Sequence, residues 1–126
     1  MCNKLDKGGS LHWYIPDGFI PSKSQGELIS HEAICILNTS EEDAKLQITI
    51  YFEDNEPIVG IEETVPKQRT RHIKTDTLQV DGNFIPKGIP YALQITGNTP
   101  ITVQYSRMDA TQPANALMTS IAYSSN

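Results

Sequence analysis

Apolar and polar residues alternate along much of this chain. In residues 44–52 every second side chain from position 46 onward is large and apolar: Leu46, Ile48, Ile50 and Phe52. A period of two is typical of a β-strand with one buried face. Residues 101–106 repeat the pattern, because Ile101, Val103 and Tyr105 share one face and polar side chains occupy the other. These two stretches therefore predict half-buried strands.

Turn residues and prolines divide the other apolar segments into short strands. We expect strands at residues 11–14, 28–38, 44–52, 58–65, 91–96, 101–106 and 116–123, and the basic segment 67–74 brings the tally to about eight. Gly97, Asn98 and Pro100 predict a turn that joins two of these strands, 91–96 and 101–106, as a hairpin. The acidic residues 39–43 predict a second hairpin connection.

Several local features refine this pattern. Residues 33–37 are apolar on both faces, which predicts a central strand covered on each side. Gly60 indicates a bulge. Residues 76–88 are expected to form a loop anchored by one apolar cluster. Phe19 and Ile20 are expected either to pack beneath their own loop or to meet a neighbouring subunit.

Helical periodicity is weak throughout, apart from a single turn expected at residues 111–115. The predicted fold class is therefore all-β, an antiparallel, jelly-roll-like β-sandwich of about eight strands. The length of 126 residues suits one domain, which we place at residues 11–126 after a flexible leader at 1–10.

Charge, cysteine content and residue spacing limit the expected partners, cellular compartment and cofactors. The formal net charge of −5 argues against general attraction to nucleic acid. Cys2 and Cys35 lie in such different contexts that we expect free thiols and a reducing compartment. The first ten residues have no hydrophobic signal core, so a cytoplasmic location is expected. Metal-ligand spacings are not found, and we expect no metal and no cofactor.

The most distinctive polar segment directly follows residues 101–106. It presents a guanidinium, a carboxylate and two amides at Arg107, Asp109, Gln112 and Asn115. Such a set suits recognition of a ligand or partner. It equally suits a corner in which these groups hydrogen-bond one another, because closely packed polar groups must be satisfied.

Two further segments carry candidate chemistry. His31 and Glu32 are adjacent, which is a weak signal for acid–base chemistry and fits better a solvent-exposed or subunit-bridging pair at a strand edge. Arg69 and Arg71 fall on one face of the basic strand and His72 on the other. The two arginines suit a carboxylate, a phosphate or an acidic partner, or alternatively the acidic turns of this same chain.

Four segments in register resemble the Anabaena sensory rhodopsin transducer family: residues 30–38, 48–57, 65–73 and, most specifically, 100–123. The resemblance implies a cytoplasmic β-sandwich that assembles as a homotetramer and couples a membrane receptor to signalling. It also implies that DNA binding and a link to carbohydrate-binding domains are open for the family. The positions that match the recurrent polar pattern of the family are Ser30, His31, Glu32, Asn38, Arg69, His72, Gln104, Arg107, Asp109, Gln112 and Asn115.

The expected function is thus a noncatalytic signal-transducer or adaptor protein that docks a membrane receptor or regulator as a homotetramer. The alternative is a regulatory module that binds a carbohydrate or acidic metabolite at the Arg107 segment, with Trp13 as the aromatic platform, and that contacts DNA. An enzyme is not expected, because nucleophile-elbow and metal-ligand spacings are missing from the sequence.

Overall fold

Strands account for nearly all the regular structure. The structure, a computed structural model, describes residues 8–22, 30–109 and 116–125. In chain order the elements are β1 (Ser10–Gly18), β2 (His31–Asn38), β3 (Ala44–Phe52), β4 (Ile58–Val65), β5 (Arg69–Lys74), the 3-10 turn η1 (Thr75–Thr77), β6 (Gln79–Val80), β7 (Asn83–Phe84), β8 (Tyr91–Asp109), β9 (Ala116–Ile121) and β10 (Tyr123–Ser125). The leader up to residue 7 and the helical turn expected at 111–115 lie outside the described residues.

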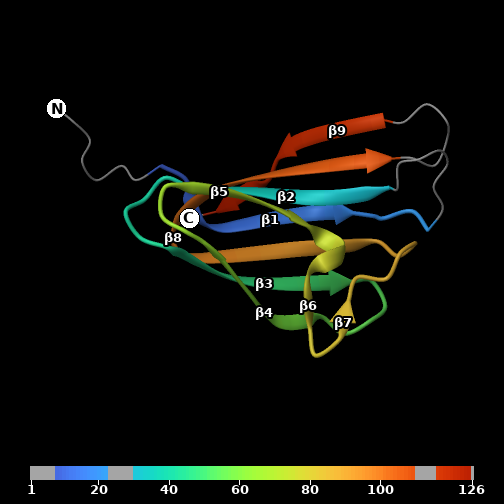
Figure 1. The fold of residues 1–126 in the computed structure, drawn as a ribbon. Coiled ribbons are helices and arrows are strands. Elements are labelled where there is room, and N and C mark those ends of the chain that lie inside the picture. The colour runs from blue at the N-terminus through green and yellow to red at the C-terminus, as the bar shows by residue number, and fades with distance from the viewer. Residues whose placement is uncertain (1–7, 23–29, 110–115, 126) are drawn as a thin grey trace.

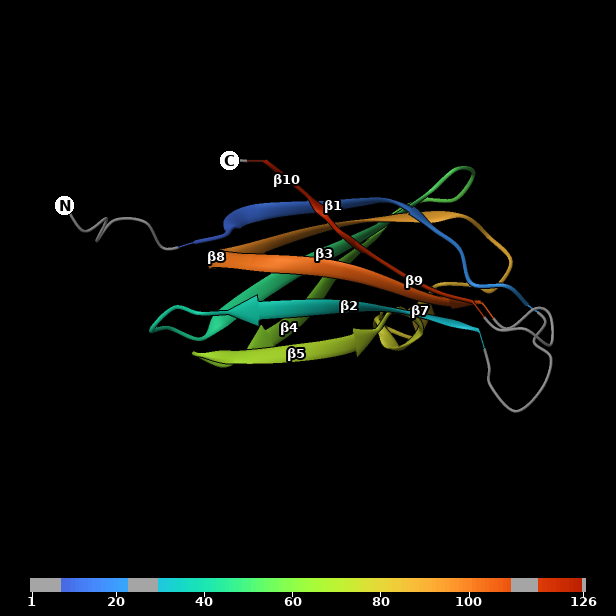
Figure 2. The same cartoon turned by 90° about the horizontal axis from the view of Figure 1, so that it is seen from above.

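Two antiparallel layers share one long strand (Figure 1). The first layer has the order β10-β1-β8-β3-β4, and the second has the order β9-β8-β2-β5. Seen from above, β1 and β3 belong to one layer and β2 and β5 to the other (Figure 2). This arrangement confirms the predicted all-β sandwich of about eight strands.

The long strand β8 corrects the first hairpin prediction. Its first half pairs with β3 as far as Gly97, and its second half pairs with β2 from Thr102 onward. The glycine and proline of residues 97–100 therefore mark the place where one continuous strand passes from the first layer to the second. Gly97 suits this passage because a Cβ there would lie 3.0 Å from the carbonyl oxygen of Thr99.

The connection from β2 to β3 corrects the second hairpin prediction. These strands do not pair with each other, since β2 lies between β5 and β8 and β3 lies between β4 and β8. The connection instead crosses between the layers and is fixed by the buried side chain of Asn38. The Asn38 amide donates to the carbonyl oxygens of Glu42 (2.7 Å) and Val65 (3.1 Å), and its Oδ1 accepts from the Ser40 backbone N–H (3.0 Å). The side chain of Asn38 thereby joins the β2–β3 connection to the end of β4.

Branched aliphatic side chains from both layers fill the space between them. The largest fully buried ones include Ile34, Ile36, Leu46, Ile48, Ile50, Leu93, Ile95 and Ile101. Ile20, one of the two residues considered for a subunit contact, is also fully buried and belongs to the core of its own chain. Trp13 is buried as well, and its indole N–H donates to the carbonyl oxygens of Ser10 and Ile101, both at 2.9 Å. Trp13 is therefore a core residue and not a ligand platform.

The predicted bulge at Gly60 is confirmed. Ile48 pairs with Ile61 and Ile50 with Ile58, so β4 contains one extra residue, and Gly60 has a φ of +85°. The segment after η1 is more regular than expected, because β6 and β7 form a two-residue hairpin. Its turn residues Asp81 and Gly82 have φ angles of +52° and +80°, as a type I′ turn requires. The expected apolar anchors are present as buried Leu78 and Ile85.

Strand β2 is central in its layer, as predicted, but only one of its faces is covered by the described chain. Glu32, Ile34 and Ile36 point inward and are buried. On the outer face Cys35 is half-buried and Leu37 is 45% exposed. The outer face of β2 is therefore only partly covered by the described part of this chain.

Candidate functional site

A buried carboxylate on β2 is the most unusual polar group of the interior. Glu32 is 1% exposed, because the alternation of β2 turns its side chain inward with Ile34 and Ile36. An isolated ionised carboxylate in such a place would be strongly destabilising, so it must be paired and hydrogen-bonded. Register supplies the partner, since Glu32 faces Arg107 on β8.

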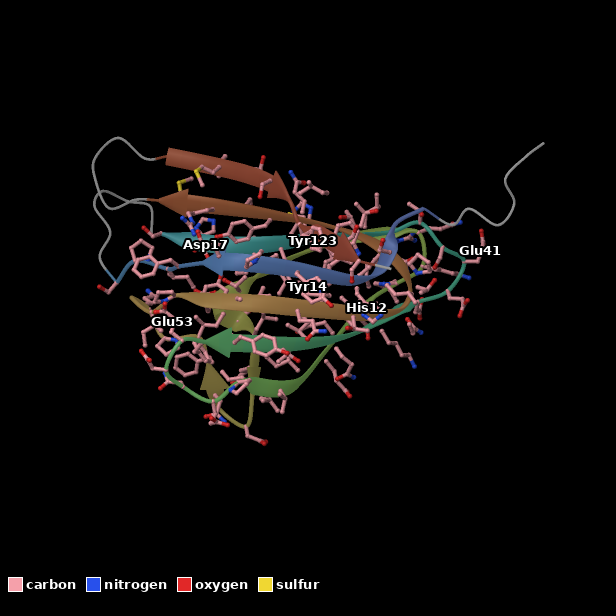
Figure 3. All side chains as sticks on the ribbon, turned by 180° about the vertical axis from the view of Figure 1, so that it is seen from behind. His12, Tyr14, Asp17, Glu41, Glu53 and Tyr123 are labelled. Carbon is pink, nitrogen blue, oxygen red and sulfur yellow. The ribbon has the colours of Figure 1, made fainter. Side chains whose placement is uncertain are left out.

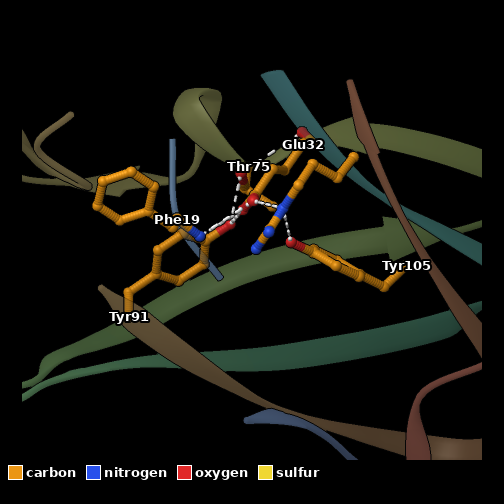
Figure 4. Close-up of polar contacts among 6 residues, drawn as sticks. Phe19, Glu32, Thr75, Tyr91 and Tyr105 are labelled. Atoms are coloured by element: carbon orange, nitrogen blue, oxygen red, sulfur yellow. Dashed lines mark hydrogen bonds and ion pairs between the residues drawn. The ribbon is translucent and has the colours of Figure 1, made fainter. Parts of the chain in front are cut away.

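Donors surround the Glu32 carboxylate from several elements (Figure 4). The Nε–H of Arg107 donates to Oε2 at 2.7 Å, and the backbone N–H of Phe19 lies 3.1 and 3.0 Å from the two carboxylate oxygens. The hydroxyl of Tyr91 donates to Oε1 and lies 3.0 Å from Oγ1 of Thr75. This cluster, which we call the Glu32 network, joins β2, β8, η1 and the segment after β1.

The Glu32 network also perturbs its neighbours. Burial, followed by the hydrogen bond to Glu32, raises the pKa of Tyr91. The same two causes raise the pKa of Tyr105, whose hydroxyl accepts from Arg107 Nε at 3.1 Å. Burial alone would lower the pKa of Arg107, but its interactions with Tyr105 and Glu32 outweigh burial and the pKa is raised. At neutral pH the tyrosines are therefore protonated and Arg107 is charged.

This geometry supports a structural role for the ion pair. Each oxygen of Glu32 already accepts hydrogen bonds, so the carboxylate is poorly suited to accept a proton from a substrate. His31 cannot act with it, because neighbouring side chains on a strand point to opposite faces. His31 and Glu32 thus form no acid–base pair. The expectation of an exposed pair at a strand edge is also wrong for Glu32, which is 1% exposed on a strand between β8 and β5.

Arg107 nevertheless borders a cleft of about 300 Å³ at the place where the last strands cross between the layers. Its side chain is 22% exposed, and within the described residues the two Nη groups donate no hydrogen bond. Tyr14 and Tyr123 pair in register at the mouth of the cleft with ring centroids 6.3 Å apart, and Asp17 lies further along β1 (Figure 3). The cleft therefore offers a guanidinium edge, two aromatic rings and a carboxylate.

Gln104 and His72 lie elsewhere, on the outer face of the second layer. Both are register neighbours of Cys35, and all three border a shallow hollow of about 260 Å³ together with Leu37 and Ile121. Burial raises the pKa of the Cys35 thiol, although its hydrogen bond with Ser106 opposes the effect. The predicted site residues thus divide between an inner network and an outer face.

The paired arginines of β5 are engaged by their own chain. Arg71 forms an ion pair of 2.7 Å with Glu63 and donates to the carbonyl oxygen of Thr64 at 3.0 Å. Arg69 donates to the carbonyl oxygen of Gln68 at 3.0 Å. Arg71 is thus paired within its own chain, but with a carboxylate of β4 and not with one of the acidic turns that were expected.

Other predicted positions cannot be assigned a contact. Gln112 and Asn115 lie outside the described residues, and Asp109 is described by its backbone, which pairs with Ala116. Tyr91 and the Phe19 backbone N–H were not predicted as parts of the Glu32 network. The sequence feature linked to Tyr91 is the glycine at position 18. Gly18 is the register partner of Tyr91, and a Cβ there would lie 2.4 Å from the ring.

The described residues lack two features that would indicate other functions. They contain no group of three or more His, Cys, Asp or Glu side chains arranged to hold a metal ion. They also contain no helix with the length and apolar character needed to cross a membrane.

The fold and the inner ion pair define a small β-sandwich protein whose two layers share one strand. The family model of the Anabaena sensory rhodopsin transducer (ASRT) matches residues 8–124. The chain therefore belongs to the ASRT family.

Two solved structures agree with this assignment. The crystal structure of Thermotoga maritima 1070 is similar with a TM-score of 0.81 and 40% identity, over 92% of this chain and 95% of that one. The Anabaena sensory rhodopsin transducer is similar with a TM-score of 0.71 and 40% identity, over 79% of this chain and 88% of that one. No curated protein matches the chain. The chain is accordingly a sensory rhodopsin transducer-like protein.

Proposed function

We propose that this chain is a noncatalytic signal-transducer or adaptor protein of the cytoplasm, which docks a membrane receptor or regulator as a homotetramer. The observation that carries this proposal is the family match over residues 8–124, together with the structural similarity to the Anabaena transducer at 40% identity. A transducer acts through contacts with other proteins, so its function depends on exposed surfaces.

The Glu32 network supports a noncatalytic role. A catalytic base needs a free lone pair within reach of substrate, and a catalytic acid needs a transferable proton. Glu32 is 1% exposed and already accepts hydrogen bonds from Arg107, Phe19 and Tyr91. The same interactions hold together four segments of the fold, which is a sufficient reason for a buried ion pair.

The outer face of the second layer supports assembly. Leu37 on β2 is 45% exposed, and Leu117 and Ile121 on β9 are 68% and 64% exposed. Ile121 pairs with Gln104, whose other neighbour is Cys35, so these side chains belong to one continuous sheet face. Exposed apolar patches of this kind are typical of subunit interfaces. Burial of this face against another copy is the assembly that we propose.

The charge of the chain supports docking on a membrane protein. Cytoplasmic loops of membrane proteins carry an excess of Lys and Arg. A chain with a formal net charge of −5 is attracted to such a surface, and the attraction accelerates encounter.

A direct test is co-purification with a membrane receptor or regulator encoded beside this chain. The tagged full chain and the candidate partner are mixed in detergent, and retention is measured at low and high salt. We expect stoichiometric retention that weakens with salt. A candidate set of which no member is retained, by a chain shown to be folded, would contradict the adaptor role.

The Arg107 cleft favours a second candidate function, binding of a small carbohydrate or acidic metabolite with a regulatory effect. Guanidinium and carboxylate groups suit hydroxyls and carboxylates, and the rings of Tyr14 and Tyr123 suit apolar ring faces. A thermal-shift screen with sugars and sugar acids tests it, since a ligand that binds the native state raises the unfolding temperature. A shift that Tyr123→Ala abolishes would support the site, and a screen without any shift would oppose it.

Contact with DNA remains a weaker prediction. Each chain has one basic strand, and Arg71 of that strand is paired with Glu63. Four copies could still add phosphate contacts, which a salt-dependent mobility-shift assay would detect.

A further inference from the structure

An apolar groove with an acidic rim lies at one end of the sandwich. It has a volume of about 480 Å³ and is bordered by the β3–β4 turn and by the β6–β7 hairpin. Phe52, Val59 and Phe84 supply its apolar side, and Glu56 and Asp81 lie at its rim. Figure 1 shows the hairpin beside that turn.

Backbone geometry exposes the apolar side chains of this groove. The extra residue at Val59–Gly60 interrupts the alternation of β4, and Val59 is 62% exposed. The Asp81–Gly82 turn folds β7 back on β6, and Phe84 is 57% exposed. A bulge and a tight hairpin therefore both present large apolar side chains to solvent at the same groove, which is unusual on a monomer surface.

The acidic groups at this end are not used by the fold. Within the described chain Glu53, Asp54, Glu56 and Asp81 form no side-chain hydrogen bond or ion pair, and all four are exposed. The other acidic turn differs, because Glu41 accepts from Gln68 and Asp43 accepts from the backbone N–H of Lys67. The two turns lie at opposite ends of the molecule, as the labels of Glu53 and Glu41 show in Figure 3.

We propose that this groove binds a basic, amphipathic segment of the partner polypeptide, with an apolar side chain inserted between Val59 and Phe84 and flanking Lys or Arg side chains at the acidic rim. The proposal rests on the receptor-docking role proposed above and assigns it a surface and a partner chemistry. Complementary charge selects the occupant, because the four exposed carboxylates at this end of the molecule repel nucleic acid and anionic lipid. Lys87 is the basic residue nearest to Phe84 in the sequence.

The test uses the full chain and a fluorescein-labelled peptide, Lys-Leu-Arg-Phe-Lys-Arg-Leu-Lys, followed by fluorescence anisotropy. The variant Val59→Thr/Phe84→Ser removes the apolar contact, and its matched control is Leu11→Thr/Tyr51→Ser on other exposed surfaces. Loss of a buried aromatic anchor is expected to weaken binding by about tenfold or more. The control variant should bind as wild type does.

Charge is tested by the rim variant Glu56→Gln/Asp81→Asn, which neutralises the two carboxylates that line the groove. Its control, Glu42→Gln/Asp76→Asn, loses the same net charge at other exposed positions. The rim variant should lose about tenfold or more in affinity at about 0.15 M salt. The control should lose much less, because at that ionic strength the Debye length of about 8 Å screens distant charges. Equal losses would overturn the proposal by showing attraction to net charge alone, and an absence of peptide binding to wild type would also overturn it.

A last comparison separates this proposal from the adaptor role. If a membrane partner is retained equally by wild type and by Val59→Thr/Phe84→Ser, the groove is not its docking surface, although the adaptor role stands. The groove is supported if wild type and the Leu11→Thr/Tyr51→Ser control both retain the partner and the groove variant does not.

Discussion

The Nε of Arg107 lies 2.7 Å from a carboxylate oxygen of Glu32, directly across the β2–β8 ladder. The pair lies between the two central strands of the second layer, where Glu32 is fully enclosed and Arg107 retains contact with solvent. This relationship makes Arg107, the first residue of the predicted polar segment, a part of the framework. Its remaining guanidinium edge borders the cleft beside Tyr14 and Tyr123.

Removal of both members of this pair should cost less than the sum of the two single removals. Arg107→Met leaves the Glu32 carboxylate buried without its cation, and we expect a loss of about 3 kcal/mol in the free energy of unfolding. The variant Glu32→Gln/Arg107→Met should be less destabilised than the sum of the single variants. Denaturant unfolding of all four proteins measures this coupling, and additive losses would contradict a direct ion pair.

Gly18→Ala should destabilise the fold through the ring of Tyr91. A Cβ at position 18 would lie 2.4 Å from the ring, so the tyrosine must move and strain the Glu32 network. We expect a loss of about 1–3 kcal/mol, typical of overpacking. In a Tyr91→Ala background the same glycine substitution should lower the free energy of unfolding much less. Denaturant unfolding measures this difference, and an unchanged loss would show that the ring is not responsible.

Alkaline pH should destabilise the fold through Tyr91 and Tyr105. The pKa of each is raised in the folded chain by burial and by the hydrogen bond to Glu32. The unfolded chain, with tyrosine pKa values of about 10, loses these protons first as pH rises. Their contribution to stability is therefore complete below about pH 10 and is lost progressively above it.

Tyr91→Phe should flatten this loss. The free energy of unfolding, measured by denaturant titration from neutral pH to above pH ~10, should fall less steeply in the variant than in wild type. Tyr51→Phe is the control, since Tyr51 is 42% exposed on β3. Identical slopes in wild type and Tyr91→Phe would show that the Glu32 network does not cause the loss of stability at alkaline pH.

Leu37→Glu should dissociate the proposed tetramer without unfolding the subunit. Leu37 is 45% exposed on the outer face of β2, so a charge there costs the single chain about 0.5 kcal/mol or less. Between subunits the same charge would be buried and unpaired. Light scattering after size-exclusion chromatography should give a smaller mass for Leu37→Glu and an unchanged mass for Leu11→Glu. Dissociation by Leu11→Glu alone would locate the interface elsewhere.

Side-chain alternation was sufficient to predict the class of the fold and several individual strands. The predicted bounds of β3 and β4 agree with those observed, as does the bulge at Gly60, because period-two burial and glycine geometry are local properties. The β6–β7 hairpin lies in the segment that we expected to be a loop. Asp81-Gly82 is a strong sequence signal for the type I′ turn observed there.

Strand pairing was not predictable from local turn signals. Gly97 and Pro100 occur where β8 passes between the layers, and the sequence at that point resembles a hairpin turn. The choice between a turn and a continuous strand depends on β2 and β3, which pair with different halves of β8 and are distant in the sequence. Non-local contacts of this kind leave little trace in a short window.

The candidate site was predicted in part. Glu32 and Arg107 were both selected by residue type, and register places them together. Tyr91 was not selected, because its role depends on the depth at which its ring lies against Gly18 and on the position of η1. A buried carboxylate attracts donors from whichever elements surround it, and that set is defined by the tertiary fold.

Sedimentation velocity of the full chain mixed with its candidate membrane receptor or regulator tests the central claim, that this protein acts by docking, most directly. The account predicts a complex that sediments faster than either component at low salt and dissociates as salt is raised, because an acidic chain meets a basic surface. Independent sedimentation of the folded chain and every candidate partner at low salt would contradict it.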